Sequence, residues 1–159
     1  MKDNLNFWTM ICASTLAFLG VFSILLSPIS STLILNTPLD FKEVYFSKSG
    51  TIIPLFGYAL LIAGGILLFV SAFKGSKKIG IIGMIILLAS ALVIFLTRQF
   101  FILSKMDSLS SYQYELLDGW YSKLGLGPIL GGVAGLVSAF MAFVVFFVFD
   151  EQGKIKKRY

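Results

Sequence analysis

The sequence predicts an all-α integral membrane protein, a bundle of four transmembrane helices. Hydrophobic residues make up 57% of its 159 residues and charged residues 13%, against roughly 25% charged residues in soluble domains. Four runs contain no charged residue, and each is about the 20 residues needed to cross a bilayer. Backbone groups in lipid must pair within their own segment, so each run is expected to be helical. The uncharged runs are residues 7–27, 53–73, 79–97 and 129–149.

The first span is expected over residues 7–27, with Phe7 and Trp8 at the interface and Pro28 beyond its end. A cleaved signal peptide is the alternative. The length of the apolar run and the lack of a small-x-small cleavage pattern ending in Ala favour a retained span. The loop that follows, 28–52, contains the strand-forming runs TLILN (32–36) and FKEVYF (41–46), with a turn expected at 37–40. This pattern predicts a small β-hairpin, with an irregular apolar loop as the alternative.

The second and third spans are expected to form an antiparallel hairpin, because only the link KGSKK (74–78) separates them. The second span covers 53–73, and the third helix is expected over 79–104, projecting past the end of the membrane span. The loop 105–127 is expected to hold a short amphipathic helix, since Ser110 and Gln113 fit a capping box and Gly119 fits a helix end. The fourth span covers 128–149. The whole chain, 1–159, is expected to be one membrane domain.

Small residues recur every fourth position at the start of the fourth span. On a helix, Gly127, Gly131, Gly135 and Ala139 would form one stripe that is nearly free of side chains. In lipid such stripes allow close packing of backbones, which predicts a helix-packing seam. Gly64 and Gly65 in the second span favour a partner within the chain over a contact with another subunit.

The placement of Lys and Arg predicts the orientation. The side with the termini and the short link has eight basic and three acidic residues, whereas the side with the two long loops has five of each. The positive-inside rule therefore places both termini in the cytoplasm. The formal net charge of +5 is thus explained by topology, and no nucleic-acid surface is expected. The residues assigned to topology and to lipid headgroups are Lys74, Lys77, Lys78, Lys154, Lys156, Lys157 and Arg158.

The composition lacks most catalytic and metal-binding groups. There is no histidine, the one cysteine is Cys12, and no span contains a charged residue. These absences argue against metal sites, cofactors, proton relays and coupled transport. Glu115 and Asp118 share one face of the expected short helix and are read as a solvated edge, so no enzyme activity is expected. Cys12 is expected to be a packing residue, with palmitoylation as the alternative.

The layout of four spans, cytoplasmic ends and a strand-containing first outer loop resembles that of claudin-like and other tetraspan proteins. The Trp-Gly-Leu-Trp stretch and the two cysteines that mark the first outer loop of claudins are missing. The resemblance therefore implies neither paracellular sealing nor family membership.

These observations predict a non-catalytic accessory subunit or scaffold of a membrane protein complex in the cell membrane. Its expected partners are membrane lipids and other integral membrane subunits, or further copies of itself, which it would contact through small-residue helix faces and outer loops. The alternative is a homo-oligomeric channel. The candidates for a polar lining are Thr9, Ser14, Thr15, Ser23 and Ser90.

Overall fold

Four long apolar helices form the protein, as predicted. The computed structural model describes residues 2–26, 29–31, 38–39, 46, 52–105 and 122–149. Within them, four stretches are long and apolar enough to cross a membrane, which fits a multi-pass membrane protein: Leu5–Leu25, Ile53–Lys74, Lys77–Phe95 and Leu126–Val148. The helices are α1 (Lys2–Phe22), α3 (Ile53–Lys74), α4 (Lys77–Phe95) and α7 (Leu126–Phe143). A 3₁₀ turn, η1 (Ser23–Leu25), continues α1, and a π-helix, η3 (Val144–Phe149), continues α7.

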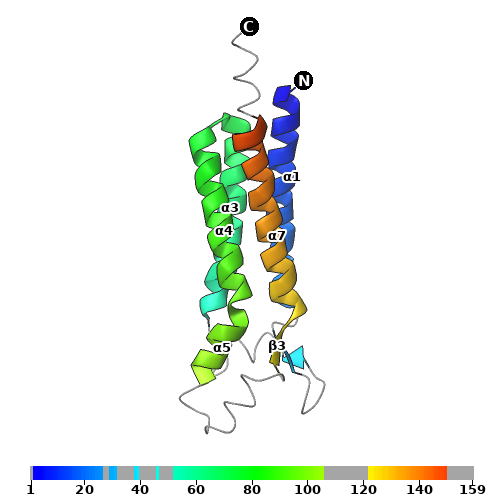
Figure 1. Cartoon of the computed structure of the whole chain (residues 1–159), viewed down its shortest axis with the longest axis vertical. Coiled ribbons are helices and arrows are strands. Elements are labelled where there is room, and N and C mark those ends of the chain that lie inside the picture. Colours follow the sequence, from blue (N-terminus) through cyan, green and yellow to red (C-terminus); the bar gives the residue numbers. More distant parts are fainter. Residues whose placement is uncertain are drawn as a thin grey trace.

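The four helices are arranged as a ring of antiparallel neighbours. Helix α3 packs against α1 and α4, and α7 packs against the other sides of α4 and α1. Figure 1 shows that the start of α1, the α3–α4 link and the end of α7 lie at one end of the bundle. Helix α5 and strand β3 lie at the opposite end. The up-and-down arrangement follows from the short link and the alternating direction of the spans.

The core contains large side chains from one half of the ring and small ones from the other. Helices α3 and α4 contribute fully buried Leu61, Leu68, Leu87 and Ile94. Helices α1 and α7 contribute mainly small side chains to the same core, namely Ala13, Ala17, Ala139 and Ala142. Small side chains allow α1 and α7 to approach closely, so the leucines of the opposite pair can fill the centre.

The α3–α4 link is fixed by backbone geometry. Gly75 ends α3 with φ of 62°, a left-handed conformation that glycine adopts without a Cβ clash. The Ser71 hydroxyl donates to Ser76 O at 2.9 Å, and Gly80 N donates to the same oxygen at 3.2 Å. Two residues, Gly75 and Ser76, therefore connect α3 to α4. Ser76 O is hydrogen-bonded to Ser71 of α3 and to Gly80 of α4.

The third span, expected as one helix over 79–104, consists of two consecutive helices. Helix α4 ends at Phe95, and α5 (Thr97–Lys105) begins after a turn at Leu96. The Thr97 hydroxyl donates to Ile94 O at 2.6 Å, a local side-chain bond that competes with regular helical pairing. Phe100 N still donates to Leu96 O at 3.0 Å, which is a helical i to i−4 bond. The chain therefore returns to helical geometry directly after the turn. Helical structure does extend to Lys105, as the sequence predicted.

Short strands join the two loops at the far end of the bundle. Strands β1 (Ile29–Ser31), β2 (Pro38–Leu39) and β3 (Ser122–Leu124) form an antiparallel sheet in the order β2-β1-β3. Pro38 and Leu39 were expected in a turn, and that expectation is wrong. A proline at the start of an edge strand is tolerated because its missing N–H is not needed for pairing. Only eight residues belong to strands, so the described fold is otherwise helical.

Several loop predictions lie outside the described residues. These are the expected strand 32–36, residues 41–45 of the second expected strand, and the amphipathic helix expected within 105–127. Phe46, the last residue of the second expected strand, lies in a turn and is exposed. Pairing between β1 and β3 was not expected, because it joins segments about 90 positions apart that only the closed bundle brings together.

Candidate functional site

The stripe of small residues on α7 faces other helices of the same chain. We call Gly127, Gly131, Gly135 and Ala139 the α7 seam, and all four are buried. A Cβ atom added to Gly127 would lie 2.7 Å from Ser23 O and 2.9 Å from Leu26 O. The start of α7 therefore rests directly on the backbone at the end of the first span.

Farther along the seam, the neighbouring helix changes. A Cβ atom at Gly131 would lie 2.7 Å from Ser23 Oγ and 3.0 Å from Tyr58 Cε1. At Gly135 it would lie 3.3 Å from the Cβ atom of Ala91 on α4. The seam thus packs against α1 and α3 near the strands and against α4 nearer the middle of the bundle.

The two predicted glycines of α3 face two different helices. A Cβ atom at Gly64 would lie 2.6 Å from the Leu87 Cγ atom, which places Gly64 against α4. At Gly65 it would lie 3.3 Å from the Ala17 Cβ atom, and Gly65 O accepts a 2.9 Å hydrogen bond from Ser14 of α1. Adjacent glycines therefore let α3 approach both of its neighbours in the ring.

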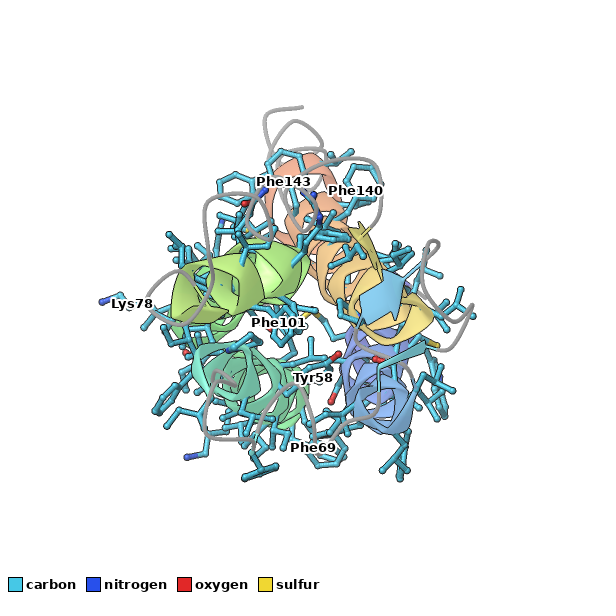
Figure 2. The ribbon with its side chains drawn as sticks, turned by 90° about the horizontal axis from the view of Figure 1, so that it is seen from below. Tyr58, Phe69, Lys78, Phe101, Phe140 and Phe143 are labelled. Carbon is cyan, nitrogen blue, oxygen red and sulfur yellow. The ribbon has the colours of Figure 1, made fainter. Side chains whose placement is uncertain are left out.

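Tyr58 is a residue that the sequence reasoning missed. It lies in the interior of the bundle (Figure 2) and is 2% exposed. Its ring lies beside Gly131. Its hydroxyl makes no hydrogen bond within the described part of the chain. The neighbouring Ser23 hydroxyl donates to Gly20 O at 2.7 Å instead. The available signal was that Tyr58 is the one tyrosine within any of the four uncharged runs.

The hydroxyls proposed for a channel lining are bonded to backbone carbonyls. Ser90 donates to Gly57 O of α3 at 2.7 Å, and Ser14 donates across to Gly65 O. Thr9 and Thr15 donate within α1, to Leu5 O and Ile11 O. Serine and threonine in membrane helices commonly bond in this way. Ser138 differs, because its buried hydroxyl has no partner within the described residues.

A basic and aromatic cluster occupies the opposite end of the bundle. Lys74, Lys77 and Lys78 are exposed on the short link and at the start of α4. Lys77 Nζ lies 5.7 Å from the centre of the Phe147 ring, which joins the ends of α4 and α7 by a cation–π contact. The Phe146 ring packs against the bare backbone of Gly80. The predicted basic residues 154–158 lie outside the described residues.

Cys12 is exposed, so its expected role as a packing residue within the chain is wrong. The buried positions described in α1 are Met10, Ala13, Ser14, Ala17 and Gly20, and residue 12 falls on the outward face. In the described ranges no three side chains of His, Cys, Asp or Glu come together as a group that could hold a metal ion.

Comparisons with protein families, with characterised proteins and with solved structures find no match to this chain. The similarity to claudin-like proteins therefore remains one of layout alone.

Two glycines of the α7 seam should respond differently to the same substitution. Gly127→Ala would press a methyl group onto backbone oxygens that cannot move independently, so we expect it to lower the free energy of unfolding by about 1–3 kcal/mol. Gly135→Ala is the matched control, because its methyl group would meet its nearest neighbours at 3.3 Å. Reversible unfolding in mixed detergent micelles measures both variants. Equal losses for the two variants would contradict the described seam.

Removing the Tyr58 hydroxyl should cost little. Tyr58→Phe breaks no described hydrogen bond, so we expect the unfolding free energy to change by less than about 0.5 kcal/mol or to rise. The comparison is Ser90→Ala, which removes a buried bond between helices and should cost about 0.6 kcal/mol, up to about 1.7. The same unfolding assay serves. A loss for Tyr58→Phe as large as that for Ser90→Ala would mean that the hydroxyl has a partner.

Proposed function

We propose that this chain is a non-catalytic subunit or scaffold of a membrane protein complex in the cell membrane. The supporting observation is the contrast between its interior and its surface. Inside, the seam glycines and three serine hydroxyls contact groups of the same chain. Outside, large aromatic side chains are left exposed on the faces of the spans. Such a bundle is closed on itself and offers its outer faces for association.

The outer face of α7 is the surface that we propose for a partner helix. Phe140 is 65% exposed, and Phe143 and Phe147 are also exposed. The rings of Phe143 and Phe147 stack with their centres 5.0 Å apart. Figure 2 shows Phe140 and Phe143 on the side of α7 that faces away from the bundle. Ordered aromatic side chains are favoured at interfaces because they contribute a large contact area at a small entropic cost.

We propose further that both termini face the cytoplasm. The start of α1, the α3–α4 link and the end of α7 share one end of the bundle (Figure 1), and the link carries Lys74, Lys77 and Lys78. A cluster of lysines next to the ends of two spans favours retention on the cytoplasmic side.

The homo-oligomeric channel has less support. Three of its candidate lining residues, Ser14, Ser23 and Ser90, are buried and donate to backbone carbonyls of the chain. Ion or solute flux through liposomes that contain the purified protein would favour the channel over the scaffold.

Purification from native membranes in mild detergent, followed by mass spectrometry, tests the proposal. We expect a larger membrane protein to co-purify with the chain, and Phe140→Ala with Phe143→Ala to reduce its recovery about tenfold, the loss typical of truncating interface anchors. The matched control is Phe22→Ala with Phe56→Ala, two exposed phenylalanines on α1 and α3. A chain that purifies alone as a monomer contradicts the proposal, and equal loss in both double variants contradicts the α7 face.

A further inference from the structure

We draw no further inference here: the strongest candidate, the buried Tyr58 hydroxyl beside Gly131 of the α7 seam, carries none, because a Cβ atom at Gly131 would already lie 2.7 Å from Ser23 Oγ and 3.0 Å from Tyr58 Cε1, which leaves no room for a ligand at this point of the bundle.

Discussion

Close contact between α7 and the end of the first span is the constraint on which the rest of the bundle depends. At Gly127 the helix rests on the backbone oxygens of Ser23 and Leu26, and no side chain larger than hydrogen fits there without displacement of the backbone. Lipid gives little hydrophobic drive between helices, so dispersion across such close contacts must hold them together. Strand pairing between β1 and β3 joins the same two segments just beyond the helices. The end of the bundle that carries the strands is therefore closed at the first span and α7.

The opposite half of the ring is organised around larger side chains. Leu61, Leu68 and Leu87 fill the space that the small residues of α1 and α7 leave open. Ser14 and Ser90 tie α1 and α4 to the carbonyls of α3, which makes α3 a shared acceptor for both neighbours. The small and polar groups of the interior therefore hold the four helices together. What the molecule offers to its surroundings is its outer aromatic faces, and the proposed function is built on these.

The sequence predicted the spans because charge is excluded from lipid, and that signal is strong and local. It predicted less about which side of each helix is buried, because lipid-exposed and buried positions are both apolar. Leu19 and Phe22 are exposed while Met10 and Ala17 are buried, and hydropathy does not separate them. The outward position of Cys12 was missed for this reason. The break at Leu96, beside the Thr97 hydroxyl that bonds Ile94 O, has no signal in hydropathy, and the β1–β3 pairing depends on the closed bundle. The position of Tyr58 beside the seam is likewise a result of tertiary packing.

The central claim, that the α7 seam closes the bundle within one chain, can be tested most directly by disulfide cross-linking. A Cβ atom at Gly135 would lie 3.3 Å from that of Ala91, close to the roughly 3.8 Å typical of a disulfide. In a chain with Cys12→Ala, the pair Ala91→Cys and Gly135→Cys is oxidised in native membranes and resolved by electrophoresis. The structure predicts a cross-linked monomer of altered mobility that reverts on reduction. A disulfide-linked dimer in place of that monomer would contradict the claim.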